Sequence, residues 1–203
     1  MLMNIGAYAL TALQPLLRMM LSAKGALVGS DVRLNGRARV SLAARGTLRL
    51  GDRVTLSSLW THNSLEARGP TILKTLAPGA SITIGSDSGL TSVTISSNVR
   101  VTIGERVLVG AGVLITDSDH HPVDIVPWSA RRRAGMAEPS DSHSVVIEDD
   151  VFVGARSIVL KGVTIGRGSV IGAGSVVVSS VPSGVVAAGN PCRVIRTLTQ
   201  EGS

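Results

Sequence analysis

The chain has 203 residues, enough for one domain with room for a small appendage. Its net charge of +6 and its pI near 10.7 indicate either arginine-rich coding bias or an anionic partner: a phosphorylated cofactor, an acidic glycan or an anionic membrane surface. Nucleic-acid binding is not expected, because no known binding motif is present and only two Trp, one Tyr and one Phe could stack on bases.

The first segment, residues 1–23, is apolar but matches neither a signal peptide nor a membrane span. No basic region precedes the apolar stretch, and Asn4, Gln14 and Pro15 interrupt it. Two interpretations remain open. Short helices on either side of Pro15 cap the open end of a solenoid, or the segment lies in a membrane interface and brings the protein to a lipid-linked substrate.

An apolar residue then recurs every six positions, with breaks. The runs are Val28, Leu34 and Val40; Leu50 and Leu56; Ile84 and Leu90, with Ile95 one position short; Ile103, Val109 and Ile115; and Ile147, Val153, Val159, Ile165, Ile171 and Val177. A period of six is neither helical nor that of a single strand. It predicts an all-β solenoid in which three hexads form the three sides of each coil and the aliphatic residues fill the interior.

Glycine often follows the inward aliphatic residue, as at Gly85, Gly104 and Gly154, where we expect it to tolerate a sharp corner or a positive φ. The predicted organisation is an amino-terminal segment over 1–24, a solenoid domain over 25–196 and a tail over 197–203. The single cysteine, Cys192, excludes an intramolecular disulfide and favours a reducing, cytoplasmic compartment, either in solution or at the inner face of the membrane.

Two of the breaks between the hexad runs are long. Residues 56–81 are irregular and contain Trp60, which is either a platform for stacking a sugar or a core or subunit-contact residue. We interpret His62 in this segment and His143 further on as surface residues. The second break, at about 117–145, is a long loop, and such loops in repeat proteins are usually functional or disordered.

The second loop opens with the run DSDHHPVD at 117–124, in which His120 and His121 lie among three carboxylates. Histidine is the side chain whose ordinary titration lies nearest neutral pH, so a histidine pair ejected from a solenoid wall among acidic groups predicts a catalytic site.

Three stretches in this order resemble the hexapeptide-repeat acyltransferases: DSDHHPVD at 117–124, IEDDVFVGARSIVLKGVTIGRGSVIGAGSVV at 147–177 and VVAAGNPCRVIR at 185–196. The resemblance is strongest to the galactoside/maltose O-acetyltransferases and to polysaccharide O-acetyltransferases. It implies a left-handed parallel β-helix and transfer of an acetyl group from acetyl-CoA to a hydroxyl of a sugar or polysaccharide precursor, directly and without an acyl-enzyme.

The same resemblance implies that His121 is the general base, with His120 in the position of a substrate-contacting residue or a less favoured base. A carboxylate or a backbone carbonyl must orient the second ring nitrogen of the base. Asp119 is our first choice, with Asp117 and Asp124 left open, and Asp117 is also expected near the substrate.

On the donor side, the resemblance implies that the backbone N–H of Ala155 stabilises the oxyanion. Pantetheine would lie along Phe152, Gly154, Ala155 and Ala173, and Arg193 and Arg196 would contact the phosphates or the adenine. Val178 and Ser179 occupy the place where relatives commonly have Thr-Lys. This departure removes one cation from the expected site, so Arg193, Arg196 or Arg167 would have to compensate.

The family resemblance also implies a homotrimer, with residues 122–144 contacting the next subunit. Three alternatives stay open: N-acetylation of an amino sugar, a metal-dependent hydratase on the same fold, and a non-catalytic scaffold. The hydratase is disfavoured because a third histidine at suitable spacing is missing, so no metal is expected.

Overall fold

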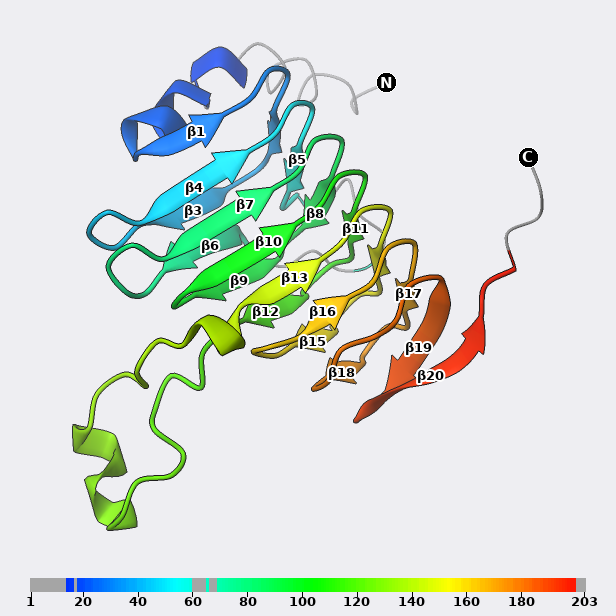
Figure 1. The fold of residues 1–203 in the computed structure, drawn as a ribbon. Helices are drawn as coiled ribbons and strands as arrows, with labels where there is room; N and C mark the ends of the chain where they lie inside the picture. Colours follow the sequence, from blue (N-terminus) through cyan, green and yellow to red (C-terminus); the bar gives the residue numbers. More distant parts are fainter. Residues whose placement is uncertain (1–13, 17, 60–64, 66–68, 200–203) are drawn as a thin grey trace.

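The computed structural model describes residues 14–16, 18–59, 65 and 69–199. Residues 14–16 and 18–23 are helical, and the chain then winds as a β-helix whose coils stack from the amino-terminal end to the carboxy-terminal end (Figure 1). The coils turn in the left-handed sense, as the resemblance predicted.

Three sheets form the walls. Sheet A contains β1 (Ala26–Val28), β4 (Thr47–Leu50), β7 (Ser81–Ile84), β10 (Arg100–Ile103), β13 (Val145–Ile147) and β16 (Thr164–Ile165). Sheet B contains β2 (Arg33–Asn35), β5 (Thr55–Ser57), β8 (Gly89–Thr91), β11 (Leu108–Val109), β14 (Phe152–Val153), β17 (Val170–Ile171), β19 (Val185–Gly189) and β20 (Cys192–Thr197). Sheet C contains β3 (Ala38–Ser41), β6 (Thr71–Thr75), β9 (Thr94–Ser97), β12 (Leu114–Thr116), β15 (Ile158–Val159) and β18 (Val176–Val177).

The core is the predicted aliphatic column. All six residues of the last run are fully buried, and strand pairing stacks them in register, for example Ile103 on Ile147 and Ile147 on Ile165. Ile95 also lies in register, opposite Ile115, because the corner before β9 is one residue shorter than the others. The all-β solenoid prediction is therefore confirmed.

The irregular segment 56–81 differs from its prediction in its second half. There β6 pairs with β3 and β9 and places Leu73 in the core. The buried neighbours on the same face are Thr71 and Thr75. Because two of the three inward residues of β6 are polar, this strand does not show the alternation of apolar and polar residues in the sequence. Trp60 and His62 lie outside the described residues.

The helical residues close the amino-terminal end of the column. Leu21 joins the core cluster. The side chain of Gln14 pairs with the backbone of Leu34 like a short strand, since its Nε2 donates to the carbonyl at 3.0 Å and its Oε1 accepts from the N–H at 2.7 Å. No helix among the described residues has the length and apolarity needed to span a membrane.

An alternating row of charges follows the edge between sheets A and B. Each coil places one residue with positive φ there, and five successive coils carry Asp31, Arg53, Asp87, Arg106 and Asp150. Arg53 forms two hydrogen bonds with Asp87, at 2.6 and 2.7 Å, and Arg106 forms two with Asp150, at 2.6 and 3.1 Å. These arginines lower the pKa values of both carboxyl groups. We call this row the charge ladder.

Candidate functional site

The loop 117–145 leaves the solenoid between β12 of sheet C and β13 of sheet A, and extends away from the coils (Figure 1). It contains two short 3₁₀ helices, η2 (Trp128–Arg133) and η3 (Asp141–His143). Its return is tied down where the N–H of Gly162 donates to the carbonyl of His143 at 2.7 Å. The loop thus begins and ends at the edge between sheets C and A.

Asp117 anchors the start of the loop. Its carboxylate is fully buried and accepts hydrogen bonds from the hydroxyl of Ser97 and from the N–H groups of Asn98, Val99 and Arg100. This arrangement favours a structural role for Asp117 over the predicted contact with substrate or with His121. Its oxygens are already occupied by four donors of the corner between β9 and β10.

His121 is exposed, and its ring is held from one side. Its Nδ1 lies 3.1 Å from the carbonyl oxygen of Gly135 on the opposite arm of the loop. A carbonyl oxygen can only accept, so the hydrogen bond requires a proton on Nδ1. In the neutral ring this leaves Nε2 as the basic nitrogen, which is the arrangement needed to take a proton from an acceptor.

Asp119, our first choice to orient His121, makes its contact elsewhere in this structure. Its carboxylate forms an ion pair with Lys161, on the coil below the loop, while the Gly135 carbonyl takes the place beside the His121 ring. Asp124 is exposed and makes no hydrogen bond with the ring. His120 has a positive φ of 61°, and its N–H donates to Ser118 Oγ at 3.0 Å.

The residues expected to bind the donor lie at a different edge, where sheet B turns into sheet C. Phe152 is half-exposed on the outer face of sheet B and lines an open groove of about 220 Å³ that crosses β5, β8, β11 and β14. Gly154 and Ala173 stack closely at the corner, since a Cβ on Gly154 would lie 2.5 Å from the nitrogen of Ala173.

The N–H of Ala155 at this corner is available. Its neighbours Gly154 and Arg156 donate to Ile171 and Ala111, whereas the Ala155 N–H donates to no other described residue. Ala155 stacks on Gly110, which lines the groove, since a Cβ on Gly110 would lie 2.6 Å from the Ala155 nitrogen. An unused backbone donor is the kind of group that stabilises a developing oxyanion.

The remaining predicted donor residues are spread over the last coils. Arg193 and Arg196 are exposed on β20, and their side-chain hydrogen bonds reach only the neighbouring carbonyls of Cys192 and Thr197, at 2.8 and 3.3 Å. Val178 and Ser179 are exposed beyond β18. Arg167 is paired with Asp149 at 2.8 Å, so it is less available for a phosphate than the two arginines of β20.

One chain does not bring the two halves of the site together. His121 follows a strand of sheet C and lies at the edge with sheet A, whereas Ala155 follows a strand of sheet B and lies at the edge with sheet C. The base and the oxyanion donor thus occupy different edges of the same prism.

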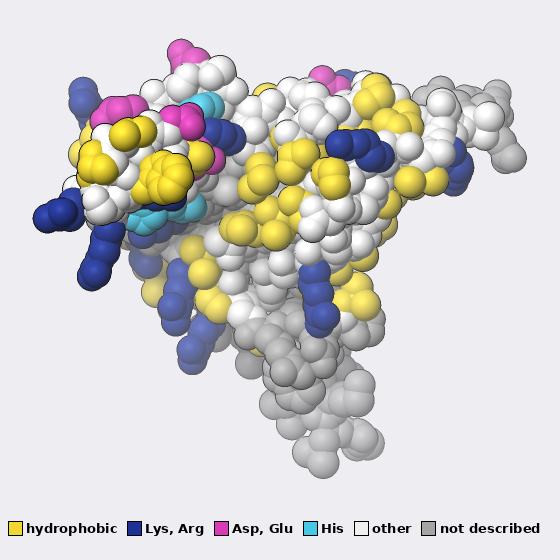
Figure 2. Space-filling model, turned by 90° about the horizontal axis from the view of Figure 1, so that it is seen from below, with side chains coloured by type: hydrophobic (Ala, Val, Ile, Leu, Met, Phe, Trp, Pro, Cys, Tyr) yellow, Lys and Arg dark blue, Asp and Glu magenta, His cyan; other side chains and the backbone are white. Residues whose placement is uncertain are grey.

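The loop also carries exposed apolar side chains. They are Val123, Val126, Trp128 and Met136, with exposed fractions of 57%, 85%, 78% and 41%. Three arginines, 131–133, follow Trp128 on η2. Seen from below, the protruding loop presents hydrophobic, basic and histidine side chains close to one another (Figure 2). Such a surface is typical of a segment that contacts another protein.

Two other kinds of site find no support. Among the described residues, no group of three His, Cys, Asp or Glu could hold a metal ion. Cys192 is buried, and burial raises the pKa of its thiol, which disfavours the reactive thiolate.

Reasoning from the sequence missed the residues that hold the loop in place. Lys161, Gly135 and Asn98, whose side chain donates to the carbonyl of Ala137 at 3.1 Å, act through contacts distant in sequence. The hexad pattern carries no signal for them, because it reports which side chains point inward and not which corners meet the loop.

Comparison with known proteins agrees with this architecture. The family model described as "Hexapeptide repeat of succinyl-transferase" matches residues 144–179. A 2,3,4,5-tetrahydropyridine-2,6-dicarboxylate N-acetyltransferase of Staphylococcus aureus is 37% identical over 97 residues, 48% of this chain and 33% of the relative. The same enzyme of Clostridium perfringens is 50% identical over 68 residues, 34% of this chain and 29% of the relative. The chain spans about a third of the length of the curated relatives it matches.

Solved structures extend the likeness to most of the chain. A galactoside acetyltransferase in complex with coenzyme A has a TM-score of 0.57 at 26% identity and covers 90% of this chain and 70% of its own. The polySia-specific acetyltransferase NeuO has a TM-score of 0.53 at 22% identity and covers 88% of each chain, which is a likeness of fold. The chain therefore contains the hexapeptide repeat and has the left-handed β-helix fold of the hexapeptide-repeat acetyltransferases.

Proposed function

We propose that this protein transfers an acetyl group from acetyl-CoA to a hydroxyl of a sugar or polysaccharide precursor. The observation that carries the proposal is the His121 ring, exposed on the loop with Nδ1 held by the Gly135 carbonyl and Nε2 left free to act as a base. The likeness to a galactoside acetyltransferase in complex with coenzyme A supports the donor and a sugar acceptor.

In the proposed mechanism, Nε2 of His121 removes the proton of the acceptor hydroxyl as its oxygen attacks the thioester carbonyl. The Ala155 N–H donates to the oxygen that becomes negative. When the tetrahedral intermediate collapses, the carbon–sulfur bond breaks and the proton passes to the departing thiolate. No acyl-enzyme is needed, in agreement with the burial of Cys192.

The groove beside Phe152 and the close corner at Gly154 and Ala173 are suited to the narrow pantetheine arm. Arg193 and Arg196 would hold the phosphates, since both guanidinium groups are exposed and neither pairs with a described carboxylate.

We further propose that the protein is a homotrimer in which the loop of one subunit reaches the groove of the next. The support is the separation of His121 and Ala155 on different edges of one chain, together with the exposed apolar side chains of the loop. A second acceptor class, an amine, is favoured by the curated relatives, which are N-acetyltransferases.

Calorimetric titration with acetyl-CoA tests the donor half of the proposal. Wild type and His121→Ala are both expected to bind with one site per subunit. In a turnover assay over sugars and amino sugars, His121→Ala should lose about 10²–10⁴-fold in kcat, the usual contribution of a general base. His143→Ala, a change at a histidine that we interpret as a surface residue, is the control and should retain most of kcat.

A complete lack of acetyl-CoA binding by the wild type would contradict the proposal and favour a non-catalytic scaffold. Turnover by His121→Ala equal to that of the wild type would leave the donor site in place but remove His121 as the base.

A further inference from the structure

The net positive charge of the molecule lies at its amino-terminal end. Residues 1–50 contain seven Lys and Arg residues and one acidic residue, Asp31, whereas the rest of the chain contains thirteen of each sign. The excess is therefore not spread over the surface, as arginine-rich coding bias would produce. It surrounds the first coil and the helical residues that cover it.

The outer face of the helical segment is apolar where a solvent-facing helix is normally polar. Leu16 and Met19 have exposed fractions of 47% and 62%, and Met20, which also borders the pocket described below, has 52%, while Leu21 enters the core.

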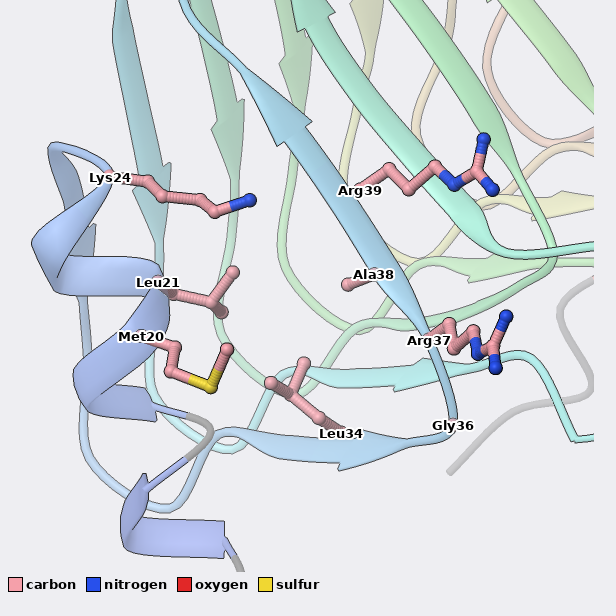
Figure 3. A pocket seen from close by; sticks show the side chains of 8 residues that line it. All are labelled: Met20, Leu21, Lys24, Leu34, Gly36, Arg37, Ala38 and Arg39. Atoms are coloured by element: carbon pink, nitrogen blue, oxygen red, sulfur yellow. The ribbon is translucent and has the colours of Figure 1, made fainter.

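A pocket of about 290 Å³ lies between the helix and the first coil (Figure 3). Leu21 and Leu34, which belong to the core cluster, line it together with Ala38 and Met20. The pocket therefore opens onto the end of the hydrophobic column, and its volume is close to the roughly 300 Å³ at which ligand pockets begin.

Three cations lie at the rim of this pocket. Lys24 extends from the helix over the space between the helix and β3, whereas the side chains of Arg37 and Arg39 leave β3 on the side that faces away from the helix (Figure 3). All three are exposed, and within the described part of the chain their side chains form no ion pair. Their charge is thus available to an external anion.

We propose that this end of the solenoid docks onto the surface of an anionic lipid bilayer. Lys24, Arg37 and Arg39 contact lipid phosphates, and the exposed face of the helix enters the boundary between headgroups and acyl chains. The combination of an apolar helix face with adjacent unpaired cations is that of interfacial membrane-binding segments. This binding is independent of acetyl transfer and goes beyond it.

Flotation of the full-length protein with vesicles tests the proposal. The protein should float with vesicles of phosphatidylcholine and phosphatidylglycerol, remain behind with pure phosphatidylcholine, and dissociate as salt rises, because salt screens exposed charges beyond about 10 Å at 0.1 M. Lys24→Gln/Arg37→Gln/Arg39→Gln should bind on the order of 100-fold more weakly, since each cation near the surface contributes about fivefold.

Arg100→Gln/Arg132→Gln/Arg133→Gln is the control, because it removes the same charge from exposed positions away from this end. It should keep its affinity within about twofold of wild type. Met19→Gln/Met20→Gln tests the apolar face and should weaken binding about tenfold. Circular dichroism and thermal unfolding of each variant establish that it is folded.

Three results would overturn the proposal. Equal losses of vesicle affinity in the control and in Lys24→Gln/Arg37→Gln/Arg39→Gln would mean that the net charge attracts the membrane and not this site. Equal flotation with neutral vesicles would exclude an anionic surface. A fall in oligomer mass on Met19→Gln/Met20→Gln, measured by light scattering, would show that a second copy of the chain covers this face.

Discussion

Glycine plays a different part in these coils from the one that its position suggests. The glycines after the inward aliphatic residues, such as Gly85, Gly104 and Gly154, do not have a positive φ. They permit close stacking, because a Cβ would overlap the backbone of the next coil. Positive φ occurs two positions later, at Asp87 and Arg106 of the charge ladder and at Arg156. The sequence predicts that a corner is present but not which atoms meet there.

Two glycines of the same coil test this distinction. A Cβ on Gly85 would lie 2.5 Å from the carbonyl carbon of Gly104, whereas one on Gly89 would meet only the end of the Leu108 side chain at 3.5 Å. We expect Gly85→Ala to lower the free energy of unfolding by about 2 kcal/mol, and Gly89→Ala to change it by less than about 1 kcal/mol. Urea denaturation measures both, and equal effects would contradict the stacking role.

Asp117 provides a second prediction at the scale of a residue. Asp117→Asn loses the charge that attracts three backbone N–H groups and the Ser97 hydroxyl, and it directs an amide N–H₂ toward donors. We expect unfolding to become easier by about 3 kcal/mol, measured by urea denaturation. Asp124→Asn, an exposed change in the same loop, should be neutral. A stable Asp117→Asn variant with reduced turnover would instead restore the substrate-binding role.

At the scale of the element, the loop 117–145 shows what a sequence can and cannot predict. Its position and its limits follow from the point where the hexads stop, and the choice of His121 follows from the family resemblance. The partner of each polar group does not, because Asp117, Asp119 and Asp124 are equivalent in the sequence. In the structure Asp117 is buried, Asp119 forms an ion pair with Lys161, and Asp124 is exposed to solvent.

The ion pair between Lys161 and Asp119 connects the loop to the next coil, so we expect it to position His121 without touching the reactants. Lys161→Gln should lower kcat by about two- to fivefold, the range of a partly exposed pair, and leave acetyl-CoA binding unchanged. The exchange Asp119→Lys/Lys161→Asp should recover part of the loss. A change in acetyl-CoA affinity, measured by calorimetry, would show that Lys161 belongs to the donor site.

At the scale of the whole molecule, the six-residue period predicts a three-sided solenoid with an aliphatic interior, whereas its left-handed turn is predicted only by the family resemblance. Assembly is less accessible to sequence reasoning. The period predicts which side chains fill the interior of the solenoid, but it does not predict which outer faces of two subunits contact each other. The separation of His121 and Ala155 on different edges becomes visible only when the loop is placed on the coil.

A mixing experiment tests a site shared between subunits. His121→Ala lacks the proposed base, and Ala173→Trp obstructs the proposed pantetheine corner, so each variant alone should be inactive. Co-expressed together, they should recover part of the wild-type activity, because some interfaces then combine an intact loop with an intact groove. Light scattering should give about three times the mass of one chain, 20.9 kDa. No recovery in mixed oligomers would place each site within a single subunit.

The charge ladder has a consequence for how this solenoid can change in length. Because the sign alternates from coil to coil, removal of one coil would place like charges next to each other, whereas removal of two would keep the alternation. The charge pattern is therefore preserved only when an even number of coils is removed. Exchanging two neighbouring charges of the ladder, as in Arg53→Asp/Asp87→Arg, keeps the ion pair between these two positions. It also places Asp31 next to a second acidic side chain and Arg106 next to a second basic one. The melting temperature of this variant should therefore fall. Lineages of such a protein should gain or lose coils in pairs.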